Sequence, residues 1–276
     1  MTDLLAVVLV LTPAELGEAP ASLARAAHAW LLNRIAEVDP DLAGTLHASD
    51  QPRPFTVSNL WGAGRAVEGR RALAPGDPCW LRFTTLTVAA SAALEQALPP
   101  IGETLDLAGL QLRVEQVATD PDAHPWAGRA AYADLVQQHT LGPGASPRGL
   151  TLNLASPTVF RRQGRDLPLP EPELVFGGYL RRWNEFAPVA LPEEAQRYAA
   201  ECVALGRFRI RSHLVSFEAG DKGAHVGFTG RISFRFLVGD AYWTRLMRLL
   251  AGYAFWCGTG YRTTAGLGQT QRLAGS

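Results

Sequence analysis

Four glycines within residues 258–268 restrict the fold of this chain more than any other feature of its sequence. The segment reads GTGYRTTAGLG, with a G-x-G pair at each end and Arg262 between the pairs. Glycine loses more conformational entropy on folding than any other residue. Such a cluster therefore indicates either tight turns at positive φ or a backbone that comes very close to a phosphate or another chain segment.

The elements around this glycine loop decide which kinds of loop it resembles. Residues 240–257 predict a helix, because Leu246, Leu250 and Tyr253 lie on one apolar stripe, and Gly258 stands where a C-terminal cap glycine belongs. Residues 269–273 leave room only for a short strand or tail. Dinucleotide-binding loops have the reverse order, strand then loop then helix. The lysine of a phosphate-binding Walker loop is also absent, so neither motif is predicted.

Length and composition indicate a globular chain with one large domain or two of about 140 residues. Of its 276 residues, 47% are hydrophobic, which is enough for a substantial core, and no apolar run approaches the roughly 18 residues of a membrane span. Leu4–Leu11 lacks a basic lead and a cleavage site, so it predicts a first strand rather than a signal peptide. The three cysteines form no disulfide or metal pattern, which favours a cytoplasmic location.

Charge is distributed unevenly although the net charge is zero. Residues 1–138 carry nine arginines against 16 acidic residues, a charge of −7, whereas residues 139–276 carry 16 arginines and Lys222 against ten acidic residues, a charge of +7. Arginine binds phosphate through two parallel hydrogen bonds and stacks on bases, which lysine does not. A GC-rich genome would also raise the share of arginine. The asymmetry nevertheless favours nucleic acid as the ligand of the second half.

The order of predicted elements indicates a repeated α+β architecture. In the first half it is strand, helix, strand, strand, helix, strand, the order of a ferredoxin-like unit, over Leu4–Thr12, Pro20–Val38, Phe55–Leu60, Cys79–Leu86, Val88–Leu98 and Leu105–Ala118. Pro20 suits the first turn of its helix, and Asp39-Pro40 should end it. A linker rich in glycine and proline follows at 139–149. The second half repeats the theme, with strands at Leu150–Leu154, Thr158–Arg162, Phe208–Phe217 and Gly227–Leu237 and helices at Glu173–Phe186, Pro192–Leu205 and 240–257. We therefore expect domains at 1–140 and 141–276.

Four stretches of the chain match a known family. They are Asp39-Pro40-Asp41-Leu42-Ala43 to His47 with Pro54–Ser58; Ser156–Arg161 running on to Leu167–Pro172; Arg182-Trp183-Asn184; and the loop Gly258–Gln269. Together they cover nearly the whole chain and resemble the CRISPR-associated endoribonucleases of the RAMP superfamily, which cut precursor CRISPR RNA within its repeats. The resemblance implies two tandem ferredoxin-like (RRM-like) domains and RNA along a cleft and a basic face. It also implies metal-independent cleavage by the RNA's own 2′-hydroxyl, leaving a 2′,3′-cyclic phosphate and a 5′-hydroxyl.

The resemblance also assigns candidate catalytic residues. The histidine at the position of His47 is frequently catalytic in the family, with a basic residue six positions on, here Arg53. The tyrosine that some members carry is replaced by Leu32, and His28 lies four residues before it on the same helix face, where it could substitute. Histidine suits proton transfer because its ordinary pKa is about 6.5. No histidines have metal-ligand spacing, so we expect neither a metal nor a cofactor. Structural or solvated roles are expected for the remaining four, His124, His139, His213 and His225.

Arginines of the second half are the candidates for RNA binding, together with the glycine loop. The residues are Arg161, Arg162, Arg181, Arg182, Arg207, Arg209, Arg211, Gly258, Gly260, Arg262, Gly266 and Gly268. Arg207, Arg209 and Arg211 alternate along a strand, which places them on one face and directs Phe208 and Ile210 to the core. Trp183 has two interpretations, a stacking platform or a structural residue.

Three functions stay open at this point. The first is the metal-independent endoribonuclease, with precursor CRISPR RNA as partner. The second is a non-catalytic RNA-binding subunit of a CRISPR effector complex, motivated by Leu32. The third is a nucleotide-binding enzyme that uses the glycine loop. Whether the chain is a monomer or a homodimer also stays open, and no membrane association is expected.

Overall fold

The computed structural model describes residues 2–48, 52–62, 66–67, 70–140, 148–216 and 224–273. Its contacts divide the chain into two units. The first unit is Met1–Ala130 together with Thr264–Gly266, and the second is Ala131–Thr263 together with Leu267–Ser276. The described residues leave out Lys222, residues 141–147 of the predicted linker and residues 218–223 between two of the predicted strands. No helix in the described part of the chain is long and apolar enough to cross a membrane.

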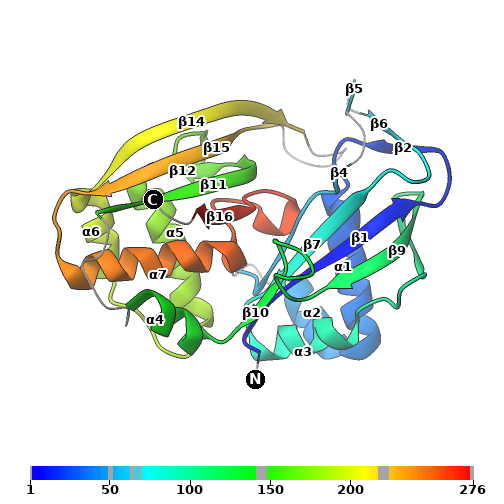
Figure 1. Cartoon of the computed structure of the whole chain (residues 1–276), viewed down its shortest axis with the longest axis horizontal. Coiled ribbons are helices and arrows are strands. Elements are labelled where there is room, and N and C mark those ends of the chain that lie inside the picture. Colours follow the sequence, from blue (N-terminus) through cyan, green and yellow to red (C-terminus); the bar gives the residue numbers. More distant parts are fainter. Residues whose placement is uncertain are drawn as a thin grey trace. The chain divides into compact units, whose positions relative to one another are not determined.

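The first unit is built on an antiparallel sheet with strand order β3-β7-β1-β9-β8 (Figure 1). These strands are β1 (Leu4–Pro13), β3 (Phe55–Val57), β7 (Cys79–Thr85), β8 (Thr104–Leu107) and β9 (Leu110–Ala118). Short strands β4 (Trp61–Gly62) and β10 (Gly128–Ala130) extend it by pairing with β7 and β1. A separate small sheet joins β2 (Gly17–Pro20), β6 (Arg70–Leu73) and β5 (Ala66–Val67).

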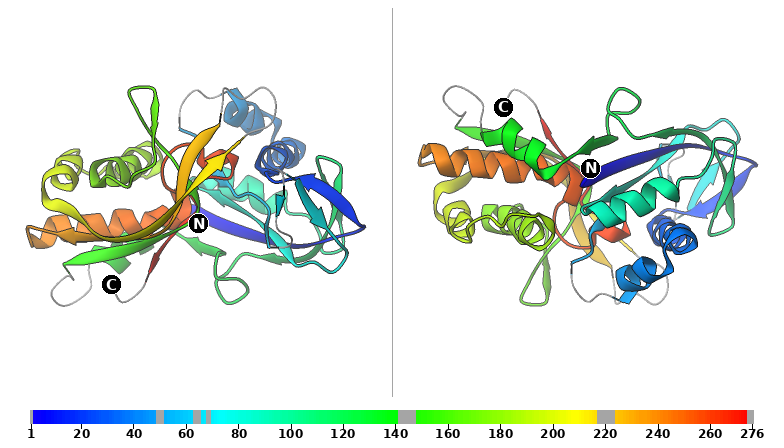
Figure 2. Two further views of the ribbon diagram at one scale, coloured as in Figure 1. Left: turned by 90° about the horizontal axis from the view of Figure 1, so that it is seen from above. Right: turned by 90° about the horizontal axis from the view of Figure 1, so that it is seen from below.

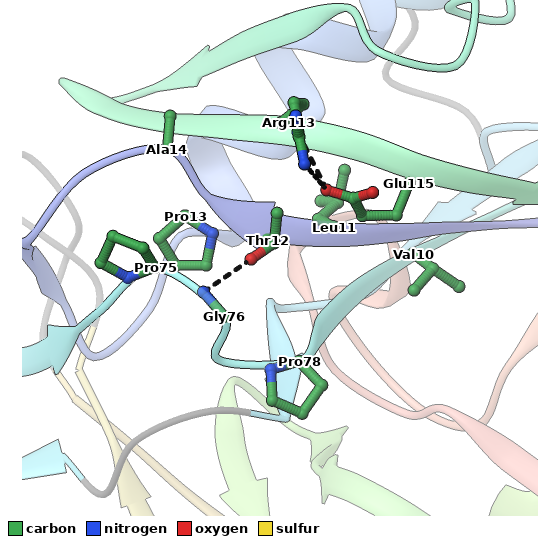
Figure 3. Close-up of a pocket in the computed structure, with 10 residues that line it drawn as sticks. All are labelled: Val10, Leu11, Thr12, Pro13, Ala14, Pro75, Gly76, Pro78, Arg113 and Glu115. Atoms are coloured by element: carbon green, nitrogen blue, oxygen red, sulfur yellow. Dashed lines mark hydrogen bonds and ion pairs between the residues drawn. The ribbon is translucent and has the colours of Figure 1, made fainter.

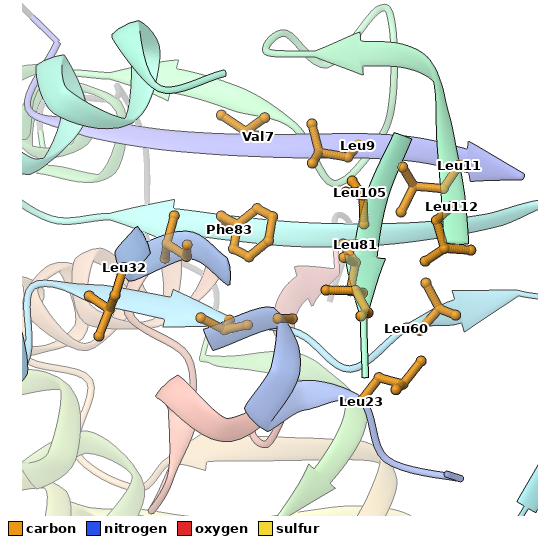
Figure 4. Close-up of a cluster of buried hydrophobic side chains, with 14 of the residues drawn as sticks. Val7, Leu9, Leu11, Leu23, Leu32, Leu60, Leu81, Phe83, Leu105 and Leu112 are labelled. Carbon is orange, nitrogen blue, oxygen red and sulfur yellow. The ribbon is translucent and has the colours of Figure 1, made fainter. Parts of the chain in front are cut away.

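Helices α1 (Ala24–Val38), α2 (Pro40–Ala48) and α3 (Val88–Gln96) cover one face of the first sheet (Figure 2). Alternate residues of β1, including Val7 and Leu9, point to this face and meet Phe83 of β7 in one buried cluster (Figure 4). Leu31 of α1 belongs to the same cluster. The buried residues of α1 recur every three to four positions, at Ala24, Ala27, Leu31 and Ile35, so they form one apolar stripe on the helix.

The first helix begins at Ala24, so the prediction that it starts at Pro20 is wrong. Pro20 instead ends β2, where it pairs with Arg70. The helix starts where the side chain of Asn59 accepts a hydrogen bond from the backbone N–H of Leu23, at 2.8 Å. The helix ends at Val38 as predicted. Asp39 then starts α2, because its Oδ1 accepts from the N–H of Leu42 at 2.9 Å.

The second unit repeats the arrangement with a four-stranded sheet in the order β14-β15-β11-β16. The strands are β11 (Gly149–Thr158), β14 (Val203–Val215), β15 (His225–Phe236) and β16 (Thr270–Leu273). Helices α5 (Pro172–Phe186), α6 (Glu194–Cys202) and α7 (Ala241–Cys257) lie on one face of this sheet, whereas α4 (Tyr132–Thr140) packs on α7 (Figure 1). The hairpin β12 (Phe160–Arg162) and β13 (Arg165–Leu167) follows β11.

Both units share one topology, which confirms the predicted α+β fold of two ferredoxin-like domains. In each sheet the central pair is the third and first strand of a β-α-β-β-α-β series, flanked by the second and the fourth. The predicted C-terminal helix is also confirmed. It begins at the cap Asp240, whose carboxylate accepts from the N–H groups of Tyr242 and Trp243, and ends at Gly258 with φ of 68°.

Strand β14 differs from the prediction at both its start and its alternation. The predicted helix Pro192–Leu205 ends at Cys202, because Val203 already pairs with Phe236. Phe208 is 56% exposed rather than in the core. β14 is an edge strand and its register with β15 shifts between Leu205 and Phe208, which accounts for the exposure of this side chain.

Candidate functional site

His28 is half-buried on α1 and is held by the end of the glycine loop. Its Nδ1 lies 2.8 Å from the carbonyl oxygen of Thr264, and its ring lies against Phe55, with centroids 5.3 Å apart. A carbonyl oxygen only accepts hydrogen bonds, so Nδ1 must carry the proton. In the neutral ring the lone pair is therefore on Nε2, which is the arrangement that a general base needs.

The pKa of His28 lies below its ordinary value of 6.5. Burial lowers it most, the hydrogen bond to Thr264 opposes this, and the charges of Arg53 and His47 lower it further. The imidazole is therefore neutral at neutral pH and able to accept a proton. The same electrostatic coupling shows that the structure brings together the three residues that the sequence singled out for catalysis.

His47 and Arg53 lie at the exposed end of α2. The Nη2 of Arg53 donates to the backbone oxygen of His47 at 3.1 Å, which satisfies one of the free carbonyls at a helix C-terminus. This bond holds a cation beside an exposed histidine. Leu32, at the position where some members of the resembled family carry a tyrosine, is 8% exposed and belongs to the hydrophobic core, so its side chain has no polar group to offer the site.

Gly266 anchors the loop segment that holds His28. Its N–H donates to the oxygen of Val57 at 3.0 Å, and it forms a parallel bridge with Ser58. A Cβ at this position would lie 2.6 Å from the Cβ of Ala24, and the φ of +89° already disfavours any other residue. Glycine is therefore required here for close packing against α1 and β3.

The rest of the glycine loop is braced by Arg182. Its guanidinium donates to the carbonyl oxygens of Gly258 at 3.1 Å and Gly260 at 2.7 Å. A Cβ on Gly260 would overlap the oxygen of Val159, and one on Gly268 would overlap the oxygen of Thr259. These contacts favour a structural role for Arg182, since its donors face the loop backbone. Trp183 is also structural, because it is 2% exposed and packs edge-on against Tyr253.

Three other arginines predicted to bind RNA contact an aromatic or acidic side chain of the second unit, and a fourth is half-buried. Arg161 lies over the ring of Tyr261, 5.3 Å from its centroid, and Arg262 lies over the same ring at 5.4 Å. Arg162 forms an ion pair with Glu171 at 2.8 Å. Arg181 is half-buried, and burial followed by the charge of Arg182 lowers its pKa.

Sequence reasoning missed a contact between His225 and Asp166, next to the ring of Tyr261. The Nδ1 of His225 lies 2.7 Å from Oδ2 of Asp166, and the His225 ring packs edge-on against Tyr261. Nothing in the sequence signals this pair, because the two residues are 59 positions apart on different strands. The pair fixes one side of the loop that carries Tyr261 and Arg262.

The sheet face of the second unit that the helices leave open is basic. Arg209 of β14 lies directly opposite Arg231 of β15, and Arg211 lies opposite Thr229. Arg207 sits at the register shift, so its alternation with the other two is broken. Arg235 shares the face of Arg231, because the two are four residues apart on one strand. Like charges directly opposite each other are destabilising unless an anion lies over them. The alternation of β15 could have indicated Arg231 and Arg235, which the sequence analysis omitted.

A cavity of about 600 Å³ opens in the first unit but includes none of the predicted site residues (Figure 3). Its walls include Pro13, Pro75 and Pro78 as well as the ion pair of Arg113 with Glu115, at 2.9 Å. Within the described ranges, no group of three histidine, cysteine, aspartate or glutamate side chains is arranged to hold a metal ion.

Comparisons with known proteins agree over nearly the whole chain. The family model described as the CRISPR Cas6 N-terminal domain matches residues 5–137, and that of the CRISPR-associated endoribonuclease Cas6 matches residues 152–270. A Cas6 solved as a product complex is 28% identical with a TM-score of 0.78, covering 98% of this chain and 99% of that one. Thermus thermophilus Cas6 is 26% identical with a TM-score of 0.74, covering 99% of each chain. A Cas6-related protein from Pyrococcus furiosus, 13% identical over 99% of this chain and 100% of that one, shares the fold at a TM-score of 0.64. No curated protein sequence gives a significant match.

Proposed function

Because the chain belongs to the Cas6 family of CRISPR-associated endoribonucleases, we propose that it cuts precursor CRISPR RNA within the repeat without a metal ion. The 2′-oxygen attacks the adjacent phosphorus, and the bond from phosphorus to the 5′-oxygen breaks. The products are a 2′,3′-cyclic phosphate and a 5′-hydroxyl. This reaction needs a proton acceptor, a proton donor and a cation, all of which side chains can supply.

The observation that carries the proposal is the hydrogen bond between His28 and Thr264. It leaves the lone pair on Nε2, so His28 takes the proton from the 2′-hydroxyl. His47, exposed at the end of α2, donates a proton to the leaving 5′-oxygen. Arg53, bonded to the His47 carbonyl, offsets the negative charge that grows on the phosphate.

RNA binding is assigned to the basic open face of the second unit, with Arg209, Arg211, Arg231 and Arg235. One relative was solved as a substrate mimic complex and also as a variant with a histidine replaced by alanine. The substrate mimic complex supports a substrate-binding enzyme. In this proposal residues 1–140 carry the catalytic histidines and residues 141–276 bind the repeat, with the whole reaction in the cytoplasm.

One observation favours a second function. Leu32 replaces the family's tyrosine and is buried, so the site has two histidines and an arginine but lacks that hydroxyl. A chain without catalysis would serve as an RNA-binding subunit that holds CRISPR RNA in an effector complex.

The deciding experiment incubates the protein with a CRISPR repeat RNA in excess EDTA, beside a twin RNA with a 2′-deoxy substitution at the cut site. A single cut in EDTA that is absent from the deoxy twin supports attack by the 2′-hydroxyl. Binding without a cut, across several repeats, supports the non-catalytic subunit. Cutting that returns only with magnesium contradicts the proposed mechanism.

A further inference from the structure

Two arginines of the second unit converge without a described acidic partner. Arg248 lies on α7 and Arg272 on β16, two elements that pack against each other. Burial and then the nearby charge of Arg248 lower the pKa of Arg272. Among the described residues neither guanidinium takes part in an ion pair. Two like charges on packed elements repel each other, and no acidic side chain of the described ranges compensates this pair.

Both arginines also have buried donors that find no hydrogen-bond partner among the residues that the structure describes. These are the Nη1 of Arg248 and the Nε of Arg272, which are shielded from solvent although each side chain as a whole is only partly buried. Donors that lose water without gaining an acceptor are rare in folded proteins and call for an explanation. An oxyanion between the two guanidinium groups would satisfy these donors and cancel the repulsion.

His139 of α4 positions one of the two arginines. Its Nδ1 lies 3.1 Å from Nη1 of Arg272, and because guanidinium only donates, Nδ1 is the acceptor. Burial and then the charges of Arg272 and Arg248 lower the pKa of His139 to about 4, so the ring is neutral at pH 7. The imidazole packs on Gly252, where a Cβ would lie 2.8 Å from the ring carbon Cδ2. His139 therefore orients Arg272 and supplies no negative charge.

We propose that Arg248 and Arg272 form a binding site for a phosphate group, with His139 holding Arg272 in place. Guanidinium is the side chain best suited to phosphate, because its planar donors match two oxygens at once. The phosphate has two possible sources, a backbone phosphate of bound RNA or free inorganic phosphate. All its residues belong to the second unit, and its existence does not depend on cleavage.

The test titrates inorganic phosphate into the RNA-free protein at constant ionic strength, with chloride as the balancing anion, and follows the thermal midpoint. We expect phosphate to raise the midpoint of the wild type. Arg248→Gln should weaken phosphate binding by about tenfold or more, because a hydrogen bond to a charged group is worth about one to two factors of ten. Arg272→Gln should do the same. The matched control is Arg197→Gln, which removes an exposed arginine of the same unit and should leave phosphate binding unchanged.

Arg248→Gln removes no hydrogen bond within the described residues, so it should fold even if Arg272→Gln does not. Measuring its affinity for repeat RNA distinguishes the two sources. Weaker RNA binding with a smaller salt dependence assigns the site to a backbone phosphate, and unchanged RNA binding with lost phosphate binding assigns it to the free anion. No phosphate effect in the wild type, or an equal effect in Arg248→Gln, overturns the proposal whether or not the protein cuts RNA.

Discussion

The Nδ1 of His28 and the carbonyl oxygen of Thr264 lie 2.8 Å apart although 236 residues separate them in the chain. Thr264 belongs to the three-residue segment that joins the first unit from the far end of the sequence. The glycine loop thus has a specific task in the first unit, which is to fix the tautomer and the orientation of one imidazole.

Replacing His28 by alanine should slow cleavage of repeat RNA by about a hundredfold to ten-thousandfold, the range typical of a lost acid–base group. RNA affinity should stay the same, because the substitution removes no cation from the second unit. Single-turnover cleavage and filter binding measure the two effects. Asn33→Ala, an exposed position on the same helix, is the control. An equal loss of binding in His28→Ala would show that His28 binds RNA rather than moves a proton.

The rate of cleavage should fall as the pH drops through the pKa of His28. In the proposed mechanism its neutral form is the base, and burial places that pKa below 6.5, so the acidic limb should have its midpoint below 6.5. A pH–rate profile under single-turnover conditions locates the limb. The limb should disappear from the residual activity of His28→Ala, and an unchanged limb would assign it to another group.

Gly268→Ala should destabilise the protein by about 1–3 kcal/mol, because a Cβ would overlap the carbonyl oxygen of Thr259 and φ is +72°. Gly178→Ala is the matched control. It lies on α5 with nothing near its Cβ, so it should stabilise by about 0.5–1 kcal/mol. Urea denaturation of both variants checks the contrast. Equal stabilities would mean that the backbone around Gly268 shifts freely.

Arg209→Ala should lower the slope of RNA affinity against salt by about one, as expected for the loss of one phosphate contact. Its stability should stay equal or rise slightly, since Arg231 would no longer face a like charge.

Arg182→Ala should instead lower the stability and leave the salt slope unchanged, because its donors hold the carbonyls of Gly258 and Gly260. The loss of stability should be about 1.5–3 kcal/mol, which is the usual contribution of a hydrogen bond to a charged group. Salt titrations and denaturation curves together separate the two roles.

Stability should fall between pH 6.5 and about 4 partly because of His139. Its pKa is about 4 in the folded state and near 6.5 when unfolded, so the unfolded chain binds the extra proton first as the pH drops. The contribution of the neutral His139 ring to stability is therefore complete above pH 6.5 and is lost as the pH falls toward 4. In His139→Gln, which keeps an acceptor for Arg272, the decline in the thermal midpoint should be smaller. Equal declines in both proteins would contradict a depressed pKa.

Periodicity was sufficient to predict most of the fold. The apolar stripe of α7, its cap glycine and the β-α-β-β-α-β order all follow from local spacing, and each is found in the structure. The errors come from pairing that local spacing does not encode. Pro20 is compatible with a helix start, but its pairing with Arg70 places it in a strand. Phe208 fits the alternation of polar and apolar residues along its strand, but the strand lies at the edge of the sheet and the side chain is exposed.

The candidate site was predictable only in part. A family resemblance singled out His28, His47 and Arg53, and their electrostatic coupling is a property of the structure. The partner of His28 and the loop contacts of Arg182 depend on chain segments more than 70 residues away, and sequence spacing carries no information about them. Arg248 and Arg272 were hidden for the same reason, since each is an ordinary arginine until the fold places them together.

The insertion of Thr264–Gly266 into the first unit has a consequence for how the protein is made. A ribosome completes the first 130 residues, with His28, His47 and Arg53 among them, long before Thr264 is synthesised. Until then the imidazole of His28 lacks the carbonyl that selects its tautomer. A nascent or prematurely terminated chain would therefore carry the three side chains proposed for catalysis without an oriented base. RNA cutting would begin only when the last part of the chain has folded into place.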